Sequence, residues 1–219
     1  MATTCRILVG LGNPGATYER TRHNVGFEVL DLWAARHGAT PWRQEKLGPA
    51  LVAKVHGDGL GPGGESAPVL LLKPTTYMNL SGKAVRAWMD FMKVPLASVL
   101  VVVDDVALEL GTVRLRANGS SGGHNGLRSI EAETASAGGA HGANGGRGGQ
   151  GYPRLRCGVG PLPPGWPLER FVLGRFTPTE KDTYETLLTT SADAIDTLLK
   201  EGMERAMNKV NAKQKPAAA

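Results

Sequence analysis

Residues 6–26 read RILVGLGNPGATYERTRHNVG, and this stretch decides the fold class. It opens with a short apolar run, Ile7 to Val9, which several glycines and a proline follow. A brief apolar run closed by such breakers is typical of a buried strand that enters a turn. A helical pattern begins at Val25 and ends before Gly38. The stretch therefore predicts a strand, a polar loop and a helix, in that order.

Two polar residues hold special positions in this unit. Asn13 lies just past the end of the predicted strand, and His23 lies just before the predicted helix. In α/β proteins, ligands bind in the crevice beyond the carboxyl ends of the strands. A histidine before a helix is more often a surface or capping residue, so this stretch alone leaves both interpretations of His23 open.

The composition excludes several classes of protein. With 219 residues, 41% apolar and 21% charged, the chain fits one soluble globular domain over residues 1–219. No apolar run is long enough to span a bilayer. The first strand begins almost at once, which leaves no room for a signal peptide or a transit segment. A precursor shortened beforehand would look the same.

Charge and cysteine content add little that is specific. A net charge of +5 and a pI near 9.4 fit a polyanionic partner without requiring one. Cys5 and Cys157 do not form a spaced cluster, so we expect two reduced core thiols and no zinc site.

Strand-like and helical segments alternate along the rest of the chain. Strand patterns occupy about 50–56, 67–73, 99–103, 112–117 and 154–159, and helical patterns occupy about 80–92, 127–134, 177–201 and 203–211. Because the two kinds of segment interleave, we expect an α/β fold: a single domain with a mixed, mostly parallel twisted sheet flanked by helices. A Gly-rich stretch at about 138–151 predicts a flexible loop, and residues 212–219 predict a disordered tail.

Details of one helix and of two strands can also be predicted. In the helix at 80–92, Asn79 or Ser81 can act as the cap. Its apolar stripe should belong to the core, and it consists of Leu80, Ala84, Trp88, Phe91 and Met92. The strands at 112–117 and 154–159 each place two arginines on one face, namely Arg114, Arg116, Arg154 and Arg156. Such faces are usually solvated, but guanidinium groups on rigid strands also suit phosphates.

The motif GLGNPG at residues 10–15 matches the dinucleotide fingerprint G-x-G-x-x-G, which is a weak signal by itself. Pro14 removes a backbone donor, and the helix starts about ten residues too late for the third glycine to open it. The acidic residues Glu28 and Asp31 lie within the helical stretch rather than at the end of a second strand. We therefore predict no nucleotide cofactor.

Other familiar chemistries are also missing. No G-x-S-x-G elbow occurs, and the histidines do not show metal-ligand spacing. What remains is a polar set at the ends of predicted strands and helices: Asn13, Tyr18, His23, Asn79, Asp105, His124 and Asn125. The set contains a base, a carboxylate that could orient it, and amide donors, but no nucleophile. This combination favours direct attack by water.

Several motifs in this chain resemble those of the bacterial-type peptidyl-tRNA hydrolases. They are GLGNPG at 10–15, TRHNVG at 21–26, PTTYMNLSG at 74–82, DD at 104–105, GGHNG at 122–126 and FVLGRF at 171–176. The resemblance covers nearly the whole chain. It implies hydrolysis of the ester bond that joins peptide to tRNA, with no cofactor and no metal. It also implies a cytoplasmic monomer, while an organellar enzyme that has lost a transit peptide stays possible.

The resemblance also implies roles for individual residues. His23 matches the general base that activates water, and Asp105 matches the carboxylate that orients it. Asn13 matches the amide that helps to distinguish blocked from free aminoacyl-tRNA. Positions that match substrate or tRNA contacts are Tyr18, Tyr77, Asn79, His124 and Asn125, with Arg114, Arg116, Arg154 and Arg156 on the segments that resemble the tRNA-contacting surface.

Two departures and one alternative accompany the resemblance. The Gly-rich stretch at 138–151 is longer than the usual loop of the family, and residues 161–169 lack the basic residues often found there. The alternative is an RNA-binding role without hydrolysis, because a splicing factor of plant organelles resembles the same family. Every position that hydrolysis needs is present here, which favours the enzyme.

Overall fold

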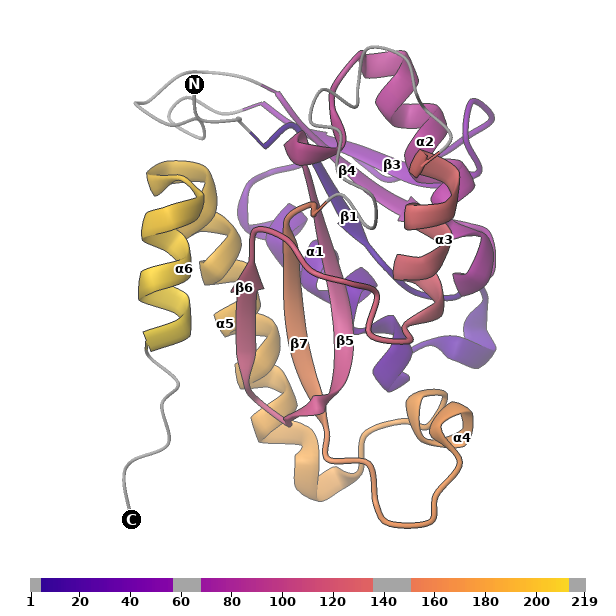
Figure 1. Ribbon diagram of the computed structural model, residues 1–219, viewed down its shortest axis with the longest axis vertical. Coiled ribbons are helices and arrows are strands. Elements are labelled where there is room, and N and C mark those ends of the chain that lie inside the picture. The colour runs from indigo at the N-terminus through magenta and orange to yellow at the C-terminus, as the bar shows by residue number, and fades with distance from the viewer. Residues whose placement is uncertain (1–4, 57–67, 136–150, 213–219) are drawn as a thin grey trace.

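In a computed structural model, residues 5–56, 68–135 and 151–212 are described, and they form a seven-stranded sheet with helices on both faces (Figure 1). The strands are β1 (Ile7–Gly10), β2 (Arg43–Glu45), β3 (Ala50–Val55), β4 (Val69–Pro74), β5 (Val99–Glu109), β6 (Val113–Arg116) and β7 (Arg154–Gly160). The α-helices are α1 (Val25–Arg36), α2 (Ser81–Met92), α3 (Asn125–Ala135), α4 (Leu168–Val172), α5 (Lys181–Glu201) and α6 (Met203–Ala212).

The sheet is mixed, with its parallel strands in the middle. The strand order is β2-β3-β4-β1-β5-β7-β6, and β4, β1, β5 and β7 run parallel to one another. The antiparallel pairs lie toward the two edges, where β2 and β3 lie on one side and β6 on the other. The predicted α/β class with a mixed sheet is therefore confirmed. The strands expected at 50–56 and 67–73 are β3 and β4, which form an antiparallel pair.

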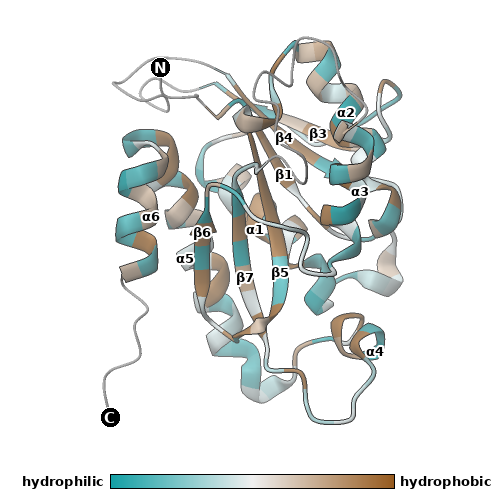
Figure 2. Ribbon diagram, in the orientation of Figure 1, coloured by the Kyte–Doolittle hydropathy of each residue, from teal (hydrophilic) through white to brown (hydrophobic). Residues whose placement is uncertain are grey.

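Each face of the sheet supports its own core. On one face, Leu8 and Val102 pack with buried residues of α1 and α5. On the other face, Val9 and Val101 pack with buried residues of α2 and α3. Figure 2 shows the central strands largely brown, whereas the helices carry both colours. The continuous apolar runs of β1 and β5 thus reflect burial on both faces.

Two glycines let β1 and α1 approach closely. A Cβ added at Gly10 would lie 2.3 Å from the carbonyl oxygen of Gly26, and one added at Gly26 would lie 2.5 Å from the backbone nitrogen of Leu11. Both contacts involve backbone atoms, which cannot move away cheaply. The motif that resembles a nucleotide fingerprint therefore serves close packing between the first strand and the first helix.

This packing makes a stability prediction. Replacing Gly10 by Ala should lower the free energy of unfolding by about 1–3 kcal/mol, because the added methyl group forces the helix away from the strand. Urea denaturation followed by circular dichroism would measure the change. A midpoint equal to that of the unsubstituted chain would contradict the close contact.

The free edge of β6 is covered by the last described helix. The side-chain amide of Asn211 accepts a hydrogen bond from the Leu115 N–H at 3.0 Å and donates one to the Leu115 carbonyl at 3.1 Å. In this way a side chain satisfies backbone groups that an edge strand would otherwise expose. The predicted helix at 203–211 is confirmed as α6, and it protects the sheet edge.

Several predictions about local structure were wrong or incomplete. Of the stripe predicted for α2, Phe91 is 64% exposed and Leu80 is 40% exposed, so neither belongs to the core. The residue that caps α2 is Leu80, and no side-chain hydrogen bond caps it. The short elements β2 and α4 were not predicted, and β5 continues six residues past the predicted end at Val103 to Glu109.

Other predictions were confirmed, and some fall outside the described residues. Cys5 and Cys157 are free thiols, and burial raises the pKa of each to about 12. Cys157 is buried as predicted, whereas Cys5 is only partly buried. The predicted Gly-rich loop, apart from Gly151, and the predicted tail after Ala212 lie outside the described residues. Over the described residues, no helix is long and apolar enough to cross a membrane.

Candidate active site

A cleft of about 1020 Å³ opens at the carboxyl ends of β1 and β5. Its lining includes Asn13, which follows β1, and His23, which lies in a 3-10 turn directly before α1. All the residues predicted for the site line this cleft, except Arg114. Loops that are distant in the sequence therefore meet at one cleft. This is the result expected from the places of these residues at the ends of strands and helices.

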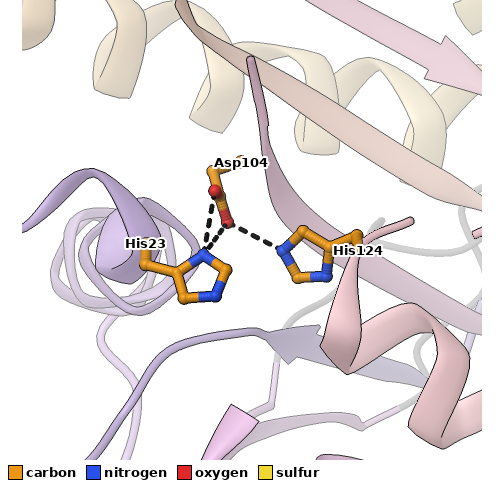
Figure 3. A group of neighbouring side chains, drawn as sticks. All are labelled: His23, Asp104 and His124. Carbon is orange, nitrogen blue, oxygen red and sulfur yellow. Dashed lines mark hydrogen bonds and ion pairs between the residues drawn. The ribbon is translucent and has the colours of Figure 1, made fainter. Parts of the chain in front are cut away.

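Asp104 is at the centre of the hydrogen bonding in this cleft (Figure 3). Both of its carboxylate oxygens lie 2.9 Å from Nδ1 of His23. One of them also lies 2.9 Å from Nε2 of His124. All three side chains are largely withdrawn from solvent, and Asp104 is 5% exposed. One buried carboxylate thus serves two imidazoles, which come from opposite sides of it.

The prediction that Asp105 orients His23 was wrong. Asp105 forms an ion pair with Arg156 and accepts a hydrogen bond from the backbone N–H of Ala107 at 2.9 Å. Adjacent residues of a strand point to opposite faces, as predicted, so only one of the two carboxylates can face α1. That one is Asp104, which shares its face of β5 with Val102 in the core beneath α1.

The hydrogen bonds assign a tautomer to each histidine. An ionised carboxylate can only accept, so both ring nitrogens that face Asp104 carry a proton. In His124 the other nitrogen, Nδ1, accepts from the backbone N–H groups of Gly126 at 3.1 Å and Leu127 at 3.4 Å. In His23 the other nitrogen, Nε2, keeps its lone pair. His23 is therefore the imidazole that is free to accept a proton from a molecule in the cleft.

The electrostatics agree with this assignment. Burial lowers the pKa of His23, but the charge of Asp104 and the hydrogen bond to it outweigh burial and raise the pKa above its ordinary value. Burial also disfavours the charged form of Asp104, which by itself would raise the pKa of this carboxyl. The two imidazoles nevertheless hold the pKa of Asp104 well below its usual range. Asp104 therefore stays ionised, and it makes His23 a stronger base than a free imidazole.

Asn13 is held by bonds on three sides. Its backbone N–H donates to Oδ1 of Asn24 at 2.8 Å, and Nδ2 of Asn24 donates to the Asn13 carbonyl at 2.9 Å. Its side-chain oxygen accepts from the backbone N–H of Met78 at 2.8 Å. Because the oxygen is occupied, the NH₂ end of the Asn13 amide is the end available to a ligand. Neither Asn24 nor Met78 was predicted as a site residue.

The substrate-contact residues predicted from the motifs also lie in the cleft. The rings of Tyr18 and Tyr77 meet edge to face with their centroids 6.3 Å apart. The side-chain oxygen of Asn125 accepts from Arg128 at 2.6 Å, which leaves the Asn125 NH₂ available in the same way as that of Asn13. Asn79 is exposed on the lining. Arg128 was not predicted, although a basic residue one helical turn after Asn125 is a signal that could have identified it.

The four predicted arginines lie on one face of two neighbouring strands. Arg114 pairs with Arg156 in the antiparallel register of β6 and β7, and Arg116 pairs with Arg154. Their environments differ. Arg116 is exposed, whereas Arg154 is 2% exposed, covers the ring of Tyr152 and donates to the Ser120 carbonyl at 2.7 Å. Arg114 donates to the carbonyl of Asn211 instead of lining the cleft.

The group of His23, Asp104 and His124 has the donor atoms of a metal site, all within 4.8 Å of one another. A metal bound at Nε2 of His124 would require the ring proton to sit on Nδ1. That nitrogen already faces two backbone N–H donors, so a proton there would be repelled. The group is therefore better suited to hydrogen bonding than to coordination of a metal.

Together, the fold and the cleft place the chain among single-domain α/β enzymes whose site lies beyond the carboxyl ends of parallel strands. The family model for peptidyl-tRNA hydrolase matches residues 7–218. A peptidyl-tRNA hydrolase of Gloeobacter violaceus is 40% identical over 208 residues, which are 95% of this chain and 94% of that protein. One of Roseiflexus sp. is 43% identical over 207 residues, which are 94% and 85% of the two chains.

A solved structure supports the same assignment. The crystal structure of peptidyl-tRNA hydrolase from Acinetobacter baumannii superposes with a TM-score of 0.81 at 29% identity, covering 99% of both chains. The chain belongs to the peptidyl-tRNA hydrolase family.

Proposed function

We propose that this protein cleaves peptidyl-tRNA by direct attack of a water molecule that His23 activates as general base. The activity itself follows from membership of the family: the enzyme hydrolyses the ester bond of an N-substituted aminoacyl-tRNA and so recycles tRNA from peptidyl-tRNA released too early. The observation that carries the mechanism is the pairing of His23 Nδ1 with both oxygens of Asp104, which leaves Nε2 as the base.

The proposed step balances without any further reactant. Nε2 of His23 takes a proton from water while the water oxygen attacks the ester carbonyl carbon. The bond from this carbon to the ribose oxygen then breaks, and the protonated imidazole returns its proton to that oxygen. Asp104 stabilises the imidazolium between the two proton transfers without itself becoming protonated. The NH₂ groups of Asn13 and Asn125, whose side-chain oxygens already accept hydrogen bonds, can donate to substrate oxygens in the cleft.

A release assay tests the activity directly. The purified chain should release the acyl group of an N-acetylaminoacyl-tRNA much faster than that of the same aminoacyl-tRNA with a free amine. The alternative role, RNA binding without hydrolysis, predicts that both substrates bind and neither is cleaved. Binding without release would therefore reject the enzyme and favour the alternative.

The arginine-bearing face of β6 and β7 supports a phosphate-binding surface beside the ester site. Arg116 is exposed and lines the cleft, so replacing it by Ala should weaken substrate binding and make the plot of log affinity against log salt shallower by about one unit. Arg43→Ala is the matched control, because Arg43 is exposed on β2 at the opposite edge of the sheet. Equal slopes for the two variants would mean that Arg116 is an ordinary solvated residue that does not contact a phosphate of the substrate.

Three expectations about the enzyme remain proposals from the resemblance. We infer a monomer that acts in the cytoplasm and that needs no metal. Size-exclusion chromatography with light scattering tests the first of these, and activity after dialysis against a chelator tests the last.

A further inference from the structure

Arg22, the residue before His23, is among the most heavily engaged side chains of the protein. Its Nη2 donates to both carboxylate oxygens of Glu180 at 2.7 and 2.8 Å. Its Nη1 donates to the carbonyl of Arg175 at 2.7 Å. The guanidinium also lies over two rings, 4.5 Å from the centroid of Phe171 and 4.8 Å from that of Phe176. This side chain therefore joins the loop before α1 to a segment about 150 residues later in the sequence.

The partners of Arg22 surround one wall of the cleft. Phe171 belongs to α4, and Arg175 lies three residues beyond the end of that helix. Three other residues of the same segment line the cleft with apolar side chains, namely Leu168, Val172 and Leu173. The backbone strengthens the connection, because the N–H of Arg22 donates to the Gly174 carbonyl at 3.0 Å.

The segment 168–175 also has support from the burial of Phe171 and Val172 and from an antiparallel bridge between Thr21 and Arg175. A helix of five residues is not stable by itself and takes its position from tertiary contacts. Figure 1 shows α4 apart from the two layers of helices that cover the sheet. Among the described elements, the 3-10 turn that contains Arg22 is the one against which α4 chiefly packs. Within that turn, the side chain of Arg22 makes the hydrogen bonds and ring contacts that reach this wall.

We propose that Arg22 is a positioning residue for the α4 wall, residues 168–175, and that this wall contributes to substrate binding rather than to the chemical step. The two roles of neighbouring residues are then separate: His23 acts on water, and Arg22 holds the α4 wall at the position that the substrate needs. This inference rests on the proposed location of the active site.

The variant that tests it best is Arg22→Met. Methionine is unbranched, can pack against both rings and makes favourable sulfur–aromatic contacts, but it cannot donate a hydrogen bond. The Glu180 side chain is 27% exposed, so water can solvate it after its partner is lost. Arg22→Lys keeps the charge but cannot bond the carboxylate and the carbonyl as a planar fork, so it should behave as an intermediate.

The chain also offers a control pair between the same two parts of the sequence. Arg36 donates to Asp193 at 2.9 Å and so joins the far end of α1 to α5, away from the cleft. Arg36→Met removes an ion pair of the same kind and should leave the kinetics unchanged. All variants should be assayed well below their melting temperatures.

We expect Arg22→Met to raise KM for N-acetylaminoacyl-tRNA about tenfold, because a displaced wall binds the substrate and the transition state equally less well. The turnover number and the pH–rate profile should stay the same, since His23 keeps its contact with Asp104. Amide hydrogen exchange in peptides that cover 168–175 should become about tenfold faster, with no change in peptides from β1 and α2.

Three results would overturn the inference. One is an unchanged KM with unchanged exchange at 168–175. Another is a lower turnover number with a shifted pH profile, which would mean that Arg22 acts through His23. The third is an equal rise of KM in Arg36→Met. Exchange at α4 does not depend on catalysis, so failure of the general-base mechanism would be seen separately.

Discussion

Replacing His23 by Ala should lower the turnover of peptidyl-tRNA by about 10²-fold or more, which is the usual scale for the loss of a general base. The imidazole is the one group in the described cleft that combines a free ring nitrogen with a buried, ionised partner, Asp104. Binding of uncleaved substrate should survive, because the arginines and asparagines of the cleft are untouched. Single-turnover release measurements, together with a binding assay, would separate the two effects.

His37 provides a matched control for this experiment. It lies directly after α1, as His23 lies before it, and its Nε2 also contacts a carboxylate, that of Asp196 at 2.8 Å. It does not line the cleft. His37→Ala should therefore keep near-normal turnover. Similar rates for the two variants would mean that the loss of an imidazole–carboxylate pair, rather than of a base, determines the effect.

Asp104→Asn should have the second largest effect, with a fall in rate of about 10²-fold and a shift of the acid limb of the pH–rate profile to lower pH. The sign follows from the pKa of His23, which the charge of Asp104 and the hydrogen bond to it raise against the effect of burial. Without that charge the imidazole loses its proton at lower pH. The unprotonated form of His23 is then present at lower pH, but this imidazole is a weaker base and is less well oriented.

The neighbouring carboxylate supplies the comparison. Asp105 forms an ion pair with Arg156 and contacts neither imidazole. The pH–rate profile of Asp105→Asn should therefore lie at the same pH as that of the unsubstituted enzyme. Measured pH–rate curves for both variants decide between the two residues. A shifted profile in Asp105→Asn with a normal profile in Asp104→Asn would reverse the assignment made from the structure.

The order of strands and helices could be predicted because each segment carries its own period. The apolar run at Ile7 to Val9 and the 3.6-residue pattern from Val25 each match the observed element closely. The arginine faces of β6 and β7 followed in the same way from strict alternation. The pattern does not tell which residues of an apolar stripe are covered by neighbouring elements. Phe91 fits the stripe of α2 yet points into solvent, because α3 and the sheet cover only part of that stripe.

Asp104 and Asp105 show why part of the site could not be predicted from the sequence. The two are adjacent, and alternation correctly placed them on opposite faces of β5. The strand before them is apolar on both faces, so nothing in its residues marks the face that α1 covers. Only the packing of Val102 beneath α1 reveals it. The resemblance to a family points to this pair of carboxylates and to Asp105 within it, whereas the structure pairs His23 with Asp104.

Contacts between distant segments were missed for a related reason. The bond between Arg22 and Glu180 joins residues that are 158 positions apart, and no local signal in either segment points to the other. The capping box of Thr177 and Glu180, by contrast, is a local signal, because its two residues are three positions apart in the sequence. Long-range pairs of this kind set the shape of the cleft, so they require the fold before they can be named.

The protonation state of the His23 ring tests the mechanism most directly. Nitrogen-15 NMR of histidine-labelled protein, with His23→Ala to assign the signals, distinguishes a protonated ring nitrogen from an unprotonated one. At a pH above the pKa of His23, the structure predicts a proton on Nδ1, held by Asp104, and a bare Nε2 that faces the cleft. A proton on Nε2 and a bare Nδ1 would contradict the account, because the ring would then have no lone pair to offer the attacking water.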